Sequence, residues 1–437
     1  MADALAGAGL RHSPAHLLGG GADVPRREAL SSTARQAPTA RSAALPAFWF
    51  FYLGGLGIFF PYAGLYLEEE LGFSPQQVGA ALAMVPLAGL IFQPLWGWFA
   101  DRSGLRRRLL ALLTAAAAFS FLLVGIAESF VAVALTLILF SAFHTSVLPM
   151  GTAVSLAAVG VRRFGWVRAC GTLGYLVCVV SLPWVMGWVE SRGGEGYDAL
   201  FPAVTGLSLA AAVAIWAMPS APQLELRSRR GDALPLLAHR PVARLLGLVF
   251  VAHALVQGPI FLFPLYVSSR GGDESNIAQL WVFMLLLEIP LIAASGPTLR
   301  RLGARGLLTL GLLAEAVRWG VCASTENLAW VAAAQLLHGV AVAGLLVGAP
   351  LYLEEAVPGR LRATGQALVS MAGFGAGAVV SNLLGGWLME RYGVEAPYAL
   401  AAVGCLLLVL TLHRVLPPPR LPSTSGAAAK LSDPEAG

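Results

Sequence analysis

A chain of 437 residues that is 57% hydrophobic and only 12% charged does not fit an ordinary soluble protein, because soluble domains carry about 25% charged residues. The net charge of +5 would suggest nucleic acid if the basic residues formed one patch, but they are scattered through short breaks between apolar stretches. Composition therefore predicts an integral membrane protein whose partners include the lipid bilayer and exclude nucleic acid.

The first 45 residues differ from the rest of the chain. Residues 1–45 are rich in Ala, Gly, Ser, Pro and Arg and have no sustained hydrophobic period. No apolar core of about 7–15 residues follows the early charges, so the segment does not read as a signal peptide. We expect a disordered N-terminal tail on the cytoplasmic side.

Twelve apolar stretches follow, and a polar segment at 219–241 divides them six and six. Each is long enough to cross a hydrocarbon core of about 30 Å as a helix. The expected parts are an N-terminal bundle (46–218), a central cytoplasmic loop (219–241), a C-terminal bundle (242–416) and a cytoplasmic tail (417–437). The stretches lie at 47–67, 76–99, 107–127, 130–152, 165–189, 199–218, 242–267, 277–297, 304–323, 327–350, 361–389 and 396–416.

The basic residues indicate the orientation. With both termini inside, three of the 29 Lys and Arg residues fall in outside loops and two fall within spans, which leaves 24 on the cytoplasmic side. This distribution satisfies the positive-inside rule, and a shift by one helix would invert every loop. We therefore expect both termini in the cytoplasm.

The turn between the second and third stretches carries a recognisable pattern. Within residues 97–108, two glycines flank an Asp-Arg pair, and three arginines follow the second glycine from Arg106 onward. The pattern resembles the signature loop of major facilitator transporters, with Leu105 at the position of a usual basic residue. The resemblance implies a contact between Asp101 and the start of the eleventh helix, and physics agrees, because a carboxylate is favoured at a helix N-terminus. The predicted gating residues are Asp101, Arg102, Arg106, Arg360 and Arg362.

The two halves also read as copies of each other. A Gly-, Phe- and Pro-containing segment at 57–66 has an echo at 258–266, and the signature loop has a degraded echo at 296–305. A parallel repeat of six plus six helices is the facilitator architecture: an all-α integral membrane protein with twelve transmembrane helices in two pseudo-symmetric bundles. This architecture places the solute site between the halves near the midplane.

Ionisable residues inside the spans are functional candidates, because burying charge in a membrane is costly. Glu315 and Arg318 lie three apart on one helical face and can pair. One interpretation is a structural ion pair; the other is a cluster whose separation drives proton uptake or release. The predicted proton-coupling residues are Glu288, Glu315, Arg318 and His338.

The start of the fifth stretch resembles the fifth helix of lactose permease and its relatives. The segment 164–175 contains Arg168 and Tyr175, and the resemblance implies that the arginine contacts solute and the aromatic ring stacks on it. A guanidinium offers several fixed donors to hydroxyls or a carboxylate. The alternative is an arginine that extends to the cytoplasmic interface.

The resemblance covers nearly all of residues 47–416, extends to a bacterial branch with phenylpropionate-permease-like members, and implies a location in a bacterial cytoplasmic (inner) membrane. Two positions depart from lactose permease. Met150 stands where that permease has its sugar-binding carboxylate, and Ala341 stands where it has its proton-carrying glutamate. The galactoside site is therefore not intact, and a proton site would be relocated.

Two further histidines, His144 and His253, are candidates for the solute site. For each, the alternative is a packing role on an apolar helix. The sequence has no phosphate-binding glycine loop, zinc-ligand spacing or nucleophile set, so we expect no enzyme activity, no metal and no cofactor other than a proton gradient.

These features predict a monomeric secondary transporter that moves a small organic solute by alternating access, as a proton-coupled symporter. Two alternatives remain open from the residues: an efflux antiporter on the same fold, and a non-transporting membrane sensor.

Overall fold

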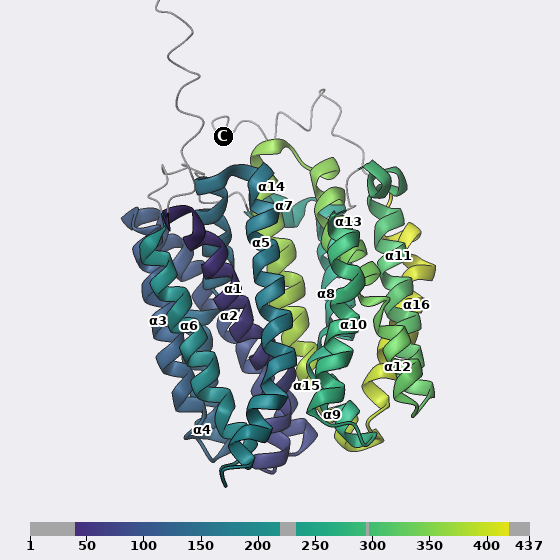
Figure 1. Ribbon diagram of the computed structural model, residues 1–437. Coiled ribbons are helices and arrows are strands. Elements are labelled where there is room, and N and C mark those ends of the chain that lie inside the picture. Colours follow the sequence, from purple (N-terminus) through teal and green to yellow (C-terminus); the bar gives the residue numbers. More distant parts are fainter. Residues whose placement is uncertain (1–39, 219–232, 294–296, 419–437) are drawn as a thin grey trace, which may run out of the picture. The chain divides into compact units, whose positions relative to one another are not determined.

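The computed structural model describes residues 40–218, 233–293 and 297–418. Most of the predicted tails and of the central loop therefore lies outside the described residues. Within them the chain is almost entirely helical and no strand occurs (Figure 1). The first helix begins at Ala40, so the last six residues of the predicted N-terminal tail are helical.

The N-terminal half contains six principal helices. Its third helix begins directly after the signature turn, where Gly104 adopts φ 68° and ends the second helix; positive φ is a conformation that glycine adopts at little cost. The elements are α1 (Ala40–Leu65), continued by η2 (Tyr66–Glu70), then α2 (Pro75–Ser103), α3 (Arg106–Val124), α4 (Phe130–His144), α5 (Val147–Glu190), η3 (Gly196–Ala199) and α6 (Leu200–Ala217).

The C-terminal half is more interrupted. A π-helical segment, η5 (Met371–Gly377), lies within its fifth crossing. The other elements are α7 (Ala233–Ala238), α8 (Arg240–Phe261), α9 (Phe263–Ser269), α10 (Glu274–Ala293), α11 (Pro297–Ser324), α12 (Leu328–Gln335), α13 (His338–Ala356), η4 (Gly359–Leu361), α14 (Arg362–Ser370), α15 (Ala378–Tyr392) and α16 (Ala396–Val415).

The predicted crossings are present, with different internal breaks. Eleven helical stretches of the described chain are long and apolar enough to cross a membrane, and they match eleven of the twelve predicted spans. The span predicted at 277–297 is α10, a helix of 20 residues, which at 1.5 Å per residue is about 30 Å long. Two of these labels each cover two helical segments joined at a glycine with positive φ. At Gly160 (φ 70°), α5 passes from the fourth crossing (Phe130–Gly160) to the fifth (Arg163–Glu190), and Gly303 (φ 65°) interrupts α11.

Arginines at matching places in the two halves tie their helices together. Arg107 in α3 donates from Nη1 to the carbonyl oxygen of Met218 at 2.5 Å, and Arg305 in α11 donates from Nη1 to that of Leu416 at 3.4 Å. Both pairs are 111 residues apart in sequence. Each half thus fastens its third crossing to the end of its sixth.

An aromatic contact recurs in the same way. Tyr66 packs edge-on against Phe201 with ring centroids 4.8 Å apart, and Tyr266 packs against Tyr398 at 4.8 Å. Each contact joins the end of a half's first crossing to the start of its sixth. The internal repeat predicted from sequence therefore reappears in the packing.

The helix bundle has two ends, a terminal side and a distal side, which carry different turns. The terminal side carries the ends of the described chain, at residues 40 and 418, and the signature turn. The distal side carries the turns at 71–74, 191–195, 270–273, 325–327 and 393–395.

Carboxylates join the two halves on the distal side. The Tyr197 hydroxyl lies 2.7 Å from Oε2 of Glu69 in its own half and 3.3 Å from Oε1 of Glu274 in α10. The Ser268 hydroxyl donates to Oε1 of Glu69 at 3.0 Å. Glu69 therefore connects the end of the first crossing to residues of both halves.

A second distal connection joins α2 to α15. Glu390 accepts hydrogen bonds from the Ser74 hydroxyl at 2.5 Å and the Gln76 backbone N–H at 3.0 Å, so a carboxylate of one half caps a helix N-terminus of the other. Deeper along the helices, a Cβ at Gly79 would lie 2.4 Å from the carbonyl oxygen of Asn382. Glycine is therefore what permits this close approach of α2 and α15.

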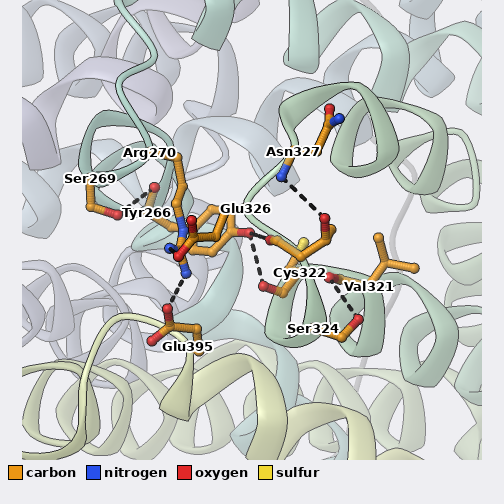
Figure 2. A network of polar contacts seen from close by, with 10 residues as sticks. Tyr266, Ser269, Arg270, Val321, Cys322, Ser324, Glu326, Asn327 and Glu395 are labelled. Carbon is orange, nitrogen blue, oxygen red and sulfur yellow. Dashed lines mark hydrogen bonds and ion pairs between the residues drawn. The ribbon is translucent and has the colours of Figure 1, made fainter.

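Within the C-terminal half, an arginine fastens three distal turns (Figure 2). Arg270 pairs with Glu326 at 2.8 Å and with Glu395, and its guanidinium lies over the Tyr266 ring at 5.4 Å. The Tyr266 hydroxyl donates to the carbonyl oxygen of Cys322 at 2.8 Å. These contacts hold the C-terminal half together at this end.

Candidate functional site

Arg168, predicted to contact solute, lies in a cluster of aromatic side chains in the N-terminal half. Its guanidinium carbon is 4.9 Å from the centroid of the Trp49 ring, a cation–π distance. Trp49 is fully buried, and its indole N–H donates to the Ser155 hydroxyl at 3.0 Å. Arg168 is half-buried and also interacts electrostatically with the Tyr52 hydroxyl. The ring fixes the guanidinium while its planar fork of N–H donors can still bind an oxygen-bearing group.

Arg168 also interacts across the seam between the halves. Its electrostatic partner there is Glu288 of α10, and α5 packs against α10. Both side chains are half-buried. A cation of one half thus faces an anion of the other within the membrane-crossing helices, where a membrane leaves few other partners for either charge.

Glu288 has a second neighbour in its own half. Its Oε2 lies 3.7 Å from Nε2 of His338 at the start of α13, which is an ion-pair distance and too long for a hydrogen bond. Gly339 permits the approach, because a Cβ there would lie 2.5 Å from the backbone nitrogen of Glu288. Two of the four predicted proton-coupling residues therefore lie together beside Arg168.

The other two predicted coupling residues form a separate, deeper pair. Nη1 of Arg318 lies 3.0 and 3.2 Å from the two carboxylate oxygens of Glu315, which confirms the predicted pairing. Nε of Arg318 donates to Oε1 of Gln335 at 2.7 Å, and all three side chains are buried. Within the described chain, Nη2 of Arg318 and Nδ1 of His338 are buried without a hydrogen-bond partner.

Tyr175, the predicted stacking residue, is engaged across the seam. Its hydroxyl accepts a hydrogen bond of 2.6 Å from the indole N–H of Trp281 in α10. Sequence reasoning missed Trp281, although it precedes Glu288 by two helical turns and therefore lies on the same face of α10.

The two histidine candidates have different surroundings. His144 stacks on Phe140 with centroids 4.7 Å apart and lies 5.7 Å from the Tyr52 ring, so it belongs to the aromatic cluster that includes Arg168. His253 is buried, and its Nδ1 lies 2.9 Å from the carbonyl oxygen of Val249 one turn earlier. It packs edge-on against Phe374 of η5 at 4.7 Å, which fits the packing alternative.

The predicted gating residues lie on the terminal side. Asp101 pairs with Arg106 of the same turn at 2.6 Å, the Arg102 guanidinium lies 5.6 Å from the Trp98 ring, and Arg362 donates to the carbonyl oxygen of Glu354 at 3.0 Å. The side chain of Arg360 lies outside the described part of the chain. The contact of Asp101 with the eleventh crossing stays a prediction.

Membrane-crossing helices in two repeated halves, with charged groups facing each other across the seam within the crossings, are the architecture of a membrane transporter. A family model described as the MFS_1 like family matches residues 43–400. The chain belongs to this family, within the major facilitator superfamily, and it has the fold predicted from sequence.

Curated relatives are transporters of different solutes. The chain is 30% identical over 390 residues to the maltose permease of Geobacillus stearothermophilus, covering 86% of this chain and 95% of the relative. It is 24% identical over 370 residues to the probable 3-phenylpropionic acid transporter of Escherichia coli strain K12, covering 81% and 93%.

Solved structures share the fold at low identity. The nucleoside transporter NupG superposes with a TM-score of 0.75 at 16% identity, covering 87% of this chain and all of that chain (100%). The inward-open xylose transporter XylE of E. coli superposes with a TM-score of 0.67 at 13% identity, covering 86% and 96%. At these identities the likeness defines the architecture alone.

Proposed function

We propose that this transporter is a proton-coupled symporter that imports a hydroxyl-bearing organic solute, a sugar before other classes, by alternating access. It works as a monomer in the bacterial cytoplasmic membrane with both termini inside. The carrying observation is the charge arrangement at the seam, where Arg168 of one half faces Glu288 and His338 of the other.

The coupling step follows from elementary electrostatics. A nearby guanidinium favours the ionised form of a carboxylate. When a solute oxygen takes over the N–H donors of Arg168, Glu288 loses part of that stabilisation and binds a proton more readily. Solute and proton are then taken up together, and His338, 3.7 Å away, is placed to pass the proton on.

Sugar is the favoured solute class for two reasons. Arg168, held by the Trp49 ring and beside the Tyr52 hydroxyl, offers donors for hydroxyl oxygens, and the Tyr175 hydroxyl lies two helical turns farther along α5. A few convergent polar groups among aromatic side chains are typical of small-molecule sites. The relative at 30% identity is a maltose permease.

The test is uptake into proteoliposomes that contain the purified protein. Radiolabelled maltose, xylose, uridine and 3-phenylpropionate are each offered with an inward proton gradient, with no gradient, and with a gradient collapsed by a protonophore. We expect accumulation of a sugar above its outside concentration with the gradient only. Equal uptake under all three conditions would remove proton coupling from the proposal.

Efflux is the second candidate, because one relative, 25% identical over 383 residues, is the sugar efflux transporter A of Dickeya chrysanthemi. The same vesicles separate the two directions. When solute is added outside the vesicles, a symporter carries protons inward and acidifies the lumen, whereas an antiporter carries protons outward and makes the lumen more alkaline. A pH-sensitive dye inside the vesicles distinguishes the two.

A further inference from the structure

The contacts between α5 and α10 share one antiparallel register. Tyr175 follows Arg168 by seven residues on α5, and Trp281 precedes Glu288 by seven residues on α10. Because a helix rises 1.5 Å per residue, each step is about 10 Å. The Tyr175–Trp281 hydrogen bond therefore lies about 10 Å distal to the Arg168–Glu288 pair, along the same seam.

Each of the two residues that form this hydrogen bond is packed firmly within its own half. Trp281 is 5% exposed and packs against the buried Phe263 ring at 5.8 Å, inside the aromatic core of the C-terminal half. On the other side, α1 presses against the backbone of Tyr175, since a Cβ at Gly57 would lie 2.5 Å from its carbonyl oxygen. A movement of one half against the other must therefore act on the bond between them.

Distal to this bond the two helices leave a hollow. It has a volume of about 200 Å³ and is lined mostly by apolar side chains. The residues that line it are Val180, Pro183, Trp184, Ser275, Ala278, Gln279, Val282 and Phe283. The next hydrogen-bonded link along the seam is Glu274 with Tyr197, at the distal end of α10. The Tyr175–Trp281 bond is thus the inner closure between the charged site and the distal side.

We propose that Trp281 is the residue that closes the solute site on the distal side, through its hydrogen bond to Tyr175. The role as a gate rests on the proposed transport function, whereas the closure itself is a property of the protein without solute. The Tyr175 hydroxyl accepts a hydrogen bond from the indole N–H of Trp281, and its own O–H can still donate one. A solute that extends from Arg168 along α5 for about 10 Å can accept a hydrogen bond from that O–H, so the gate and the solute share one hydroxyl.

Hydrogen–deuterium exchange of the purified protein in lipid nanodiscs, without solute, tests the closure. The variants are Trp281→Phe, which keeps a ring and removes the N–H, Tyr175→Phe, which removes the acceptor, and the two together. Trp184→Phe is the matched control, because Trp184 lies on the same seam but is 80% exposed and forms no part of the proposed closure.

We expect each single variant to raise amide exchange at the distal ends of α2 and α10 (residues 75–85 and 274–284) about fivefold, the population change that one neutral hydrogen bond supports. Amide exchange at these ends should be no faster in the double variant than in either single variant, because all three variants lack the same hydrogen bond. Residues 98–103 and 362–370, on the terminal side, should exchange no faster than in the parent protein.

Three results would overturn the proposal: unchanged distal exchange in Trp281→Phe, an equal rise at both ends, which signals general destabilisation, or the same rise in Trp184→Phe. Failure of solute uptake in proteoliposomes, with the distal exchange pattern as expected, would instead remove the transport assignment and leave the closure standing.

Discussion

Two arginine–glutamate pairs lie within the described membrane-crossing helices, and they differ in what a movement of the halves does to them. Glu315 and Arg318 lie three residues apart on one helix, in direct contact at 3.0 Å and fully enclosed. Arg168 and Glu288 belong to different halves, are half-buried, and interact at longer range. Only the second pair changes its separation when the halves move.

The sequence left two interpretations open, a structural ion pair and a proton-responsive cluster, and this difference indicates which pair fits which interpretation. A pair within one helix turn stays intact through alternating access, so Glu315–Arg318 fits the structural ion pair. A pair across the seam responds to the state of the transporter, so Arg168–Glu288, with His338, fits the proton-responsive group. We therefore propose different tasks for the two pairs of the predicted cluster, with His338 interacting with both Glu288 and Arg318, and the variants below test this assignment.

The largest effect should come from breaking the enclosed pair. Arg318→Met leaves the Glu315 carboxylate buried without its cation, and we expect the free energy of unfolding to fall by about 3–5 kcal/mol. The double variant Glu315→Met with Arg318→Met removes both charges and should recover most of that loss. Denaturation of the purified protein in detergent measures both. A stable double variant that no longer accumulates solute would give the enclosed pair a part in coupling.

Removing the cation at the seam should affect solute binding instead of folding. Arg168→Ala loses charge-assisted hydrogen bonds, each contributing about 1.5–3 kcal/mol, so we expect solute affinity to fall about 10- to 100-fold while the protein inserts and folds normally. Arg168→Lys keeps the charge but not the planar fork of donors, so its solute affinity should lie between those of the parent protein and Arg168→Ala. Calorimetric titration with the solute found in the uptake screen measures the loss, and unchanged affinity would remove Arg168 from the site.

Glu288→Gln should separate coupling from movement. The amide cannot take up a proton, so accumulation driven by the proton gradient should fall about tenfold or more, while exchange of labelled for unlabelled solute continues. The amide has nearly the shape of the carboxylate, so we expect the variant to insert and fold normally. Counterflow and gradient-driven uptake in the same vesicles are compared. Intact accumulation would mean that another group carries the proton.

The smallest effect is expected at the exposed pair of the signature turn. Asp101 is 61% exposed, and exposed ion pairs contribute about 0.2–1 kcal/mol. Asp101→Asn should shift the population toward the inward-facing state by about fivefold at most. Crosslinking between cysteines placed across the terminal side reads the shift. No change in yield would refute the predicted latch between Asp101 and the eleventh crossing.

The sequence predicts the crossings well because each depends on local composition. A helix in lipid needs only length and apolar side chains, and these are visible in any one stretch, as for α3 or α6. The interruptions are harder. The turn at Gly160 falls in the break predicted between 152 and 165, whereas the π-helical η5, inside the predicted span 361–389, depends on what packs beside the helix.

The candidate site was predictable in its residue types and not in its pairing. Hydropathy reveals Glu288 and Arg168 as charges within spans, but their opposition depends on how α5 and α10 lie across the seam. Trp281 is one of 11 tryptophans, and its partner is 106 residues away. Conversely, Glu315–Arg318 was predicted because a pair three residues apart needs no tertiary information.

The shared register of α5 and α10 has a thermodynamic consequence. The charge pair and the inner closure lie on the same two helices, so the free energy of opening the distal side and the free energy of binding solute are linked. Linkage is reciprocal: whatever factor solute contributes to closure, closure must contribute to solute affinity. The closed fraction of the solute-free protein therefore sets the factor by which full closure could still raise the apparent affinity for the cargo, and this factor can be measured before the cargo has been identified.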